Sequence, residues 1–202
     1  MRKASEILYR FRGYILALFA IALIACPAAP FPQGKSISEF VPYIAALFLY
    51  AGGIALRVRA RQYIGQHTRG STHTADELVT DGPYAQCRHP LYTSNLFIAL
   101  GAASFHLGTS QLFVLFAPAL LLFEFALARA EDRFLEEKFG DTWRAWALRT
   151  PMVPSRVAIF TFKSDSAPRR TFLQAFKADA STWFWFVFFN LIIVLLKLHG
   201  LR

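Results

Sequence analysis

Charged residues are scarce in this sequence. Asp, Glu, Lys and Arg make up 17% of its 202 residues, whereas hydrophobic residues make up 55%. The apolar residues also occur in long runs, and not at the spacing of an amphipathic helix or strand. This composition excludes an ordinary soluble domain and favours a protein embedded in a lipid bilayer.

Cysteine is rarer still, and nothing indicates a disulfide or a metal site. The two cysteines are Cys26, in the first apolar run, and Cys87, in a polar segment, and there is no CxxC pair. The expected topology holds them too far apart for a disulfide. Four histidines lack the spacing of metal ligands: His67, His73, His106 and His199.

Five apolar runs define the expected architecture. They cover residues 14–32, 40–56, 91–107, 112–128 and 183–198, and each is close to the roughly 20 residues that a bilayer-spanning helix needs. Residues 23–26 resemble a lipoprotein signal box, but we interpret the N-terminus as an uncleaved first helix. We expect an all-α integral membrane protein with about five transmembrane helices.

The net charge of +9 is unevenly distributed along the chain. Four of the 22 Lys and Arg lie in residues 1–13, five in residues 57–92 and ten in residues 129–182. With five crossings these segments share one side of the membrane, so 19 of the 22 are cytoplasmic under the positive-inside rule. The N-terminus is then inside and the C-terminus outside, in a bacterial inner membrane. This placement of charge argues against nucleic acid as a partner.

The two long inner connections carry most of the residues that are suited to chemistry. In the first, a Thr-Asp-Gly-Pro turn precedes His89 and Pro90, and Pro90 suits the first turn of a helix, which places His89 near the N-cap. In the second, the fourth membrane helix is expected to continue to Phe139 and to end at Gly140. Helical spacing then places Glu131 on the same face as residues 134–135. We expect these connections and this helical extension to form a cytoplasmic pocket.

Two stretches carry a specific resemblance. GPYAQCRHPLYTSN and EDRFLEEKFGDTWRAWALRTPMVP resemble the signature blocks of the isoprenylcysteine carboxyl methyltransferase and phospholipid methyltransferase superfamily. The resemblance covers residues 78–154, within a methyltransferase-like domain of residues 1–159. Residues 160–202, with the last span, form a C-terminal extension outside it. The sequence departs from the family pattern at Asp132, Ser94, Trp143 and Trp146, where the family has Glu, Gly and two tyrosines.

The resemblance implies binding of S-adenosylmethionine from the cytosol. Arg88 is then expected to bind the cofactor carboxylate, and Glu131 its ribose hydroxyls or its ammonium group. Tyr84 or Tyr92 is expected to stack on the adenine. The full set of expected cofactor-binding residues is Tyr84, Arg88, His89, Pro90, Tyr92, Glu131 and Asp132.

The acceptor is expected to be a lipid or a lipid-modified molecule with a carboxylate, phosphate or amine group. An amine arrives protonated and needs a base, for which the candidate is Glu124, an acid within the fourth apolar run. Arg88 and Glu124 are therefore the expected catalytic residues. Acceptor binding is assigned to Tyr92, Asn95 and Glu124, beside an opening between helices. The basic connections are expected to recruit anionic membrane lipids.

Two other functions remain open from the sequence. One is an NADPH-dependent membrane reductase similar to the sterol reductases, although Pro90 stands where their pattern has another residue. The second is a non-enzymatic scaffold or transporter, which would spread polar residues through the spans instead of collecting them at one face. The oligomeric state and the identity of the acceptor cannot be deduced from the sequence.

The charge distribution predicts the topology directly. Reporter fusions after residues 33 and 107 should report an outer location, a fusion after residue 72 should report a cytoplasmic location, and a fusion after Arg202 should report an outer one. Alkaline phosphatase and fluorescent-protein fusions measure this. A cytoplasmic signal after Arg202 would refute five crossings.

Overall fold

The computed structural model describes residues 2–64, 75–154 and 166–200, and within these ranges it contains helices and no strand. The long helices are α1 (Arg2–Ala25), α2 (Val41–Tyr63), α3 (Pro90–Leu107), α4 (Gln111–Phe139) and α7 (Ala180–Leu198). The short ones are η1 (Ile37–Glu39), η3 (Gly82–Ala85), α5 (Asp141–Ala147) and α6 (Phe172–Lys177). The protein is thus all-α, as its apolar runs predict.

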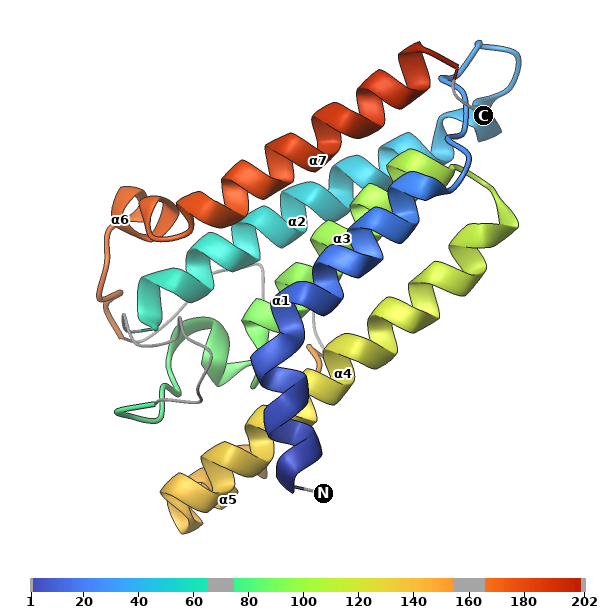
Figure 1. Ribbon diagram of the computed structural model, residues 1–202. Coiled ribbons are helices and arrows are strands. Elements are labelled where there is room, and N and C mark those ends of the chain that lie inside the picture. The colour runs from blue at the N-terminus through green and yellow to red at the C-terminus, as the bar shows by residue number, and fades with distance from the viewer. Residues whose placement is uncertain (1, 65–74, 155–165, 201–202) are drawn as a thin grey trace.

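The long helices form an elongated bundle (Figure 1). Helix α3 makes its most extensive contacts with α2 and also packs on α4, while α1 packs on α4. The N-terminus, η3, α5 and α6 gather at one end of the bundle, and the C-terminus lies at the other (Figure 1). The two sequence blocks that resemble the methyltransferase signatures therefore share one end.

Among the described residues, four helical segments are long and apolar enough to cross a membrane: Ile7–Ala25, Ile37–Tyr63, Gln111–Phe139 and Ala180–Leu198. A helix satisfies all its own backbone hydrogen bonds, which a bilayer interior demands. Helix α3 covers the expected third run but is not among the four candidates. It contains Asn95, Ser104 and His106, and it packs against α2 and α4.

Two helices end at places that the apolar runs do not mark. Helix α1 ends at Ala25 and not at Pro32, because Pro27 and the prolines after it cannot continue a helix. Helix α2 continues seven residues beyond Leu56 to Tyr63. It therefore includes Arg57 and Arg61, whose buried side chains pair with an acid from another helix. An apolar run ends at the first charged residue, whereas a helix can continue through charged residues, as α2 does here.

Helices α2 and α3 approach each other closely through two glycines. A Cβ atom on Gly53 of α2 would lie 2.9 Å from Cγ1 of Ile98 and 3.1 Å from the carbonyl oxygen of Ser94. One on Gly101 of α3 would lie 2.8 Å from the ring of Tyr50. Small residues at such contacts let membrane helices pack by van der Waals attraction.

Lys197 fastens α7 at the end of the bundle opposite α5 and α6. Its ammonium group donates to the carbonyl oxygen of Ala29 and to the hydroxyl of Tyr43, the latter at 3.2 Å. The same nitrogen lies 5.3 Å from the ring centroid of Phe105 and 5.5 Å from that of Phe31. These contacts satisfy a buried cation by hydrogen bonds and cation–π attraction.

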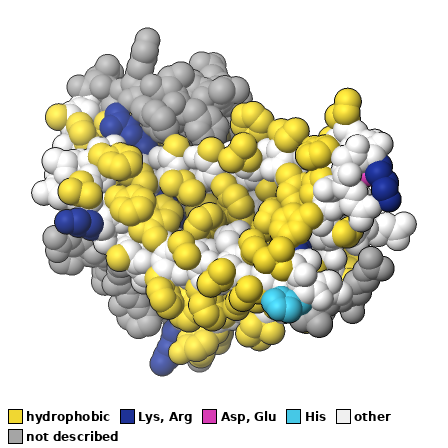
Figure 2. All heavy atoms as spheres, turned by 90° about the horizontal axis from the view of Figure 1, so that it is seen from above, with side chains coloured by type: hydrophobic (Ala, Val, Ile, Leu, Met, Phe, Trp, Pro, Cys, Tyr) yellow, Lys and Arg dark blue, Asp and Glu magenta, His cyan; other side chains and the backbone are white. Residues whose placement is uncertain are grey.

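The outer face of α7 is apolar. Its exposed side chains include Phe184, Trp185, Val187, Phe188, Leu191 and Leu195. Figure 2 looks onto this side of the molecule and shows hydrophobic side chains over most of it, with basic side chains near its rim. Large exposed aromatic and aliphatic side chains on a candidate span are typical of contact with lipid.

Replacing Gly53 with Ala should destabilise the bundle by about 1 to 3 kcal/mol, because the added methyl group overpacks the contact between α2 and α3. Thermal unfolding of the purified protein in detergent measures this. Gly13→Ala is the matched control, since a Cβ there meets nothing within 4 Å, and the change should be neutral or stabilising. A Gly53→Ala protein as stable as the control would contradict the packing argument.

Candidate active site

A pocket of about 500 Å³ opens at the end of the bundle that holds η3 and α5. Its walls come from the first half of α1, the end of α2, the η3 turn, the start of α3, the last third of α4 and the first turn of α7. The volume falls in the range of small-molecule and cofactor sites. The pocket is therefore large enough for a nucleotide-sized ligand.

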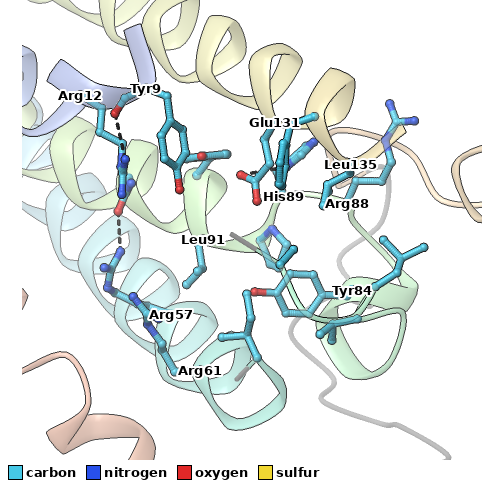
Figure 3. Close-up of a pocket in the computed structure, with 18 of the residues that line it drawn as sticks. Tyr9, Arg12, Arg57, Arg61, Tyr84, Arg88, His89, Leu91, Glu131 and Leu135 are labelled. Atoms are coloured by element: carbon cyan, nitrogen blue, oxygen red, sulfur yellow. Dashed lines mark hydrogen bonds and ion pairs between the residues drawn. The ribbon is translucent and has the colours of Figure 1, made fainter. Parts of the chain in front are cut away.

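Most of the residues expected from the sequence meet in this pocket (Figure 3). Those that line it are Tyr84, Arg88, His89, Pro90, Tyr92, Asn95 and Glu131. Asp132 and Glu124 do not line it. These nine residues come from two parts of the chain about 40 positions apart, and the fold brings seven of them to one cavity.

Asp132 holds Arg88 and His89 in place. Its Oδ1 accepts a hydrogen bond from Nε2 of His89 at 2.9 Å, and its Oδ2 lies 3.2 Å from Nη2 of Arg88. All three side chains are largely buried, and His89 is the N-cap residue of α3, followed by Pro90 at its first position. A carboxylate that accepts from two basic groups makes strong charge-assisted bonds. Asp132 therefore orients the two side chains from behind the pocket wall.

Glu131 lies on the pocket side of α4. Its carboxylate is 30% exposed, its Oε2 is 3.9 Å from Nδ1 of His89, and it accepts a hydrogen bond from Tyr92. Phe134 and Leu135 line the same wall, so the acid stands beside apolar packing as the helical spacing predicts. A partly exposed carboxylate in a cavity can bind hydroxyl or ammonium groups of a ligand.

Tyr84 presents a buried hydroxyl that has no hydrogen-bond partner among the described residues. Burial raises the pKa of this phenol well above its usual value, so it stays a neutral donor. Nε1 of Trp146 donates to the carbonyl oxygen of Tyr84 at 3.2 Å. The turn before it requires Gly82, which has φ +58° and whose Cβ would lie 2.6 Å from the Tyr63 ring. An unpaired buried donor beside a cavity is a place where a ligand oxygen fits.

Sequence reasoning missed a second charged group in the pocket. Arg57 and Arg61 of α2 both donate through Nε to Oδ2 of Asp179, at 2.9 and 3.0 Å. Asp179 precedes α7, in the part of the chain that the sequence analysis placed outside the family resemblance, yet it lines the pocket. Two arginines one helical turn apart at the end of an apolar run are a signal for a buried partner. No comparable signal marks Asp179.

Helix α1 also contributes to the pocket. Tyr9 and Arg12 line it (Figure 3), and the Arg12 guanidinium lies 3.8 Å from the ring centroid of Tyr9. Both residues lie before the first apolar run expected from the sequence. No motif pointed to them.

Glu124 is buried in α4, near Asn95 and Arg57. Neither of its carboxylate oxygens completes a hydrogen bond of ordinary geometry among the described residues. Asn95 itself accepts from the guanidinium of Arg57. Glu124 is thus separated from the cavity surface but lies beside one of its lining residues.

Both cysteines are free, as expected. Burial raises the pKa of the Cys87 thiol, which donates to the carbonyl oxygen of Met152 at 3.2 Å. In the part of the chain that the structure describes, no three His, Cys, Asp or Glu side chains are grouped to hold a metal ion. His67 and His73 lie outside the described residues.

Comparison with known proteins identifies the family. Residues 41–142 match the family described as phospholipid methyltransferase. The chain belongs to this family. The match runs from the start of α2 to the start of α5, so it includes pocket-lining residues of both motif blocks but neither α1 nor α7.

Two curated proteins are similar to this member of the phospholipid methyltransferase family. They are the cobalt-zinc-cadmium resistance protein CzcN of Cupriavidus metallidurans and the nickel-cobalt-cadmium resistance protein NccN of Alcaligenes xylosoxydans xylosoxydans. Each is 33% identical over 146 residues, which are 70% of this chain and 64% and 65% of the respective relatives. The chain thus spans a little under two thirds of their length. No solved structure matches it.

Replacing Asp132 with Ala should destabilise the protein by about 3 kcal/mol, because Arg88 and His89 would lose their common buried acceptor. Thermal unfolding in detergent measures the change. Asp141→Ala is the control, since Asp141 is 96% exposed and its ion-pair partner among the described residues is the exposed Arg144, and it should have no measurable effect. Equal stabilities of the two variants would show that Asp132 does not hold this wall together.

Proposed function

We propose that this protein transfers the methyl group of S-adenosylmethionine to a lipid or lipid-modified acceptor at the cytoplasmic face of a bacterial inner membrane. The observation that carries the proposal is the convergence of the motif residues on one pocket, at one end of a bundle of apolar helices. Membership of the phospholipid methyltransferase family supports the same reaction class.

The polar atoms of the pocket fit the chemical groups of the cofactor. S-adenosylmethionine supplies a methyl group activated by a sulfonium, and it also carries a carboxylate, an ammonium group and ribose hydroxyls. Arg88 pairs with the carboxylate, aided by donors at the start of α3 beside His89. The unpaired hydroxyl of Tyr84 and the buried, unpaired Nε of Arg88 offer further donors. Glu131 accepts from the ribose hydroxyls or pairs with the ammonium group, and Tyr92 packs beside the adenine.

The chain contributes to the transfer mainly by positioning. Methyl transfer is a direct displacement, so alignment of the acceptor and exclusion of water supply most of the rate enhancement. Asp132 keeps Arg88 and His89 oriented, and the apolar side chains of Leu91 and Leu135 help to exclude water. A carboxylate or phosphate acceptor needs no base. An amine acceptor transfers its proton to Glu124, which lies beside Asn95 of the pocket wall.

The acceptor enters from the bilayer, and the cofactor enters from the cytosol. Tyr92 and Asn95 lie near the start of α3 and line the pocket. The rest of α3 is largely apolar and runs along the bundle. A headgroup at this position meets the cofactor while its tails stay in hydrocarbon. The basic residues at the pocket end attract anionic lipid, and the pocket end is the cytoplasmic one under the positive-inside rule. The two relatives are named as metal resistance proteins. Methylation of a membrane component is compatible with such a role.

Binding and product analysis together test the proposal. Purified protein in detergent should bind S-adenosylhomocysteine by calorimetry and should not bind NADPH. Membrane extracts from cells with the protein should contain a lipid that is one CH₂ group heavier than in cells without it, by mass spectrometry. Binding of NADPH alone would favour the reductase, and binding of neither would favour a scaffold or transporter.

Replacing Glu131 with Gln should weaken the binding of S-adenosylhomocysteine by about 1 to 3 kcal/mol, because a charged acceptor in a partly dry site is lost. Isothermal titration calorimetry on folded protein measures the affinity. Glu137→Gln is the matched control, an exposed acid on the same helix that does not line the pocket. An unchanged affinity in Glu131→Gln would show that this acid does not contact the cofactor.

A further inference from the structure

The pocket has a second wall built around a buried acid. Arg57 and Arg61 lie one turn apart on α2, and the carboxylate of Asp179 sits between them. Asp179 is fully buried, and the two arginines are 8% and 6% exposed. Nη2 of Arg57 also donates to the hydroxyl of Thr182 at 3.1 Å. Two guanidinium groups thus share one carboxylate supplied by the chain.

This arginine wall faces the motif wall across the cavity. Figure 3 shows Arg57 and Arg61 on one side of the pocket and Glu131 and His89 on the other. The motif wall holds the groups that fit the cofactor. The arginine wall, with Asn95 at its edge, therefore borders the space that is left for the acceptor headgroup.

The carboxylate of Asp179 is fixed in this place by its backbone. Its N–H donates to the carbonyl oxygen of Phe176 at 3.0 Å, and its carbonyl oxygen accepts from the N–H groups of Thr182 and Trp183 at 2.8 and 3.1 Å. These bonds fix the backbone of the turn between α6 and α7, and the turn places the Asp179 side chain between the arginines. The arginine pair therefore carries a permanent internal counter-anion.

We propose that Asp179 determines the headgroup selectivity of the acceptor site. An arginine pair without a carboxylate is a strong site for a phosphate. With Asp179 between the arginines, the wall carries a net charge of +1 and not +2, because the carboxylate repels the dianionic phosphate monoester that the two guanidinium groups attract. Such repulsion against one class of ligand is a common source of specificity. Asp179 thus shifts the selectivity of this wall away from dianionic headgroups and toward neutral or zwitterionic ones. The inference rests on the proposed function, because it names the acceptor class of that pocket.

Direct lipid binding tests this inference without measuring turnover. The full chain and its Asp179→Asn variant are titrated in detergent with phosphatidic acid, phosphatidylcholine and inorganic phosphate. The variant should bind phosphatidic acid about tenfold more tightly, with little change for phosphatidylcholine. A parallel gain for inorganic phosphate assigns the effect to the anion itself, and a gain for the lipid alone assigns it to the anchored headgroup. Unchanged or weaker binding of phosphatidic acid would overturn the proposal.

Two further variants separate selectivity from folding. Asp141→Asn, which changes an exposed acid outside the pocket, should leave all three affinities unchanged. Arg61→Gln keeps Asp179 and removes one positive charge, so a folded Arg61→Gln protein should bind phosphatidic acid about tenfold more weakly. If Arg61→Gln binds phosphatidic acid as tightly as the wild-type protein does, the arginine wall does not contact the headgroup. This conclusion holds whether or not Asp179→Asn folds.

S-adenosylhomocysteine binding is measured on the same samples. If the wild-type protein does not bind S-adenosylhomocysteine, this result counts against the proposed function. The lipid selectivities would still decide the role of Asp179, because they need no cofactor.

Discussion

Neutralisation of buried arginines is the constraint on which the pocket depends. Isolated charges at the end of an apolar bundle are costly, so each must meet an acid of opposite charge. Asp132 serves Arg88 together with His89, and Asp179 serves Arg57 together with Arg61. Asp132 lies on α4 behind one wall, and Asp179 lies just before α7 and lines the opposite wall. The shape of the cavity therefore follows from two shared carboxylates.

The apolar runs and the motif blocks predicted much of this arrangement. Runs of apolar residues locate the long helices, because a bilayer admits few other elements. Pro90 and Gly140 mark helix ends by their own stereochemistry, and both stand where expected. The helical spacing of Glu131 relative to Leu135 also placed that acid on the pocket wall. These features are local in the chain and can be read from neighbouring residues.

What could not be predicted depends on contacts between distant segments. The run of residues 40–56 stops at Arg57, but the helix continues to Tyr63, and the partner of its buried arginines, Asp179, lies more than 100 residues away in the chain. Asp179 itself is one acid in a polar stretch, with no motif around it. Glu124 was recognised as unusual within its run, but a sequence cannot show that it is buried beside Asn95 and does not itself line the cavity. Tertiary pairing decides such cases.

Helix α7 is fastened at both ends, by Asp179 at the pocket and by Lys197 at the far end. This has an evolutionary consequence. A lineage that lost the helix would leave both arginines in the pocket wall without the carboxylate that they now share. Evolution should therefore retain α7, although this helix lies outside the family match. Homologous chains without α7 should carry uncharged residues at the positions of Arg57 and Arg61.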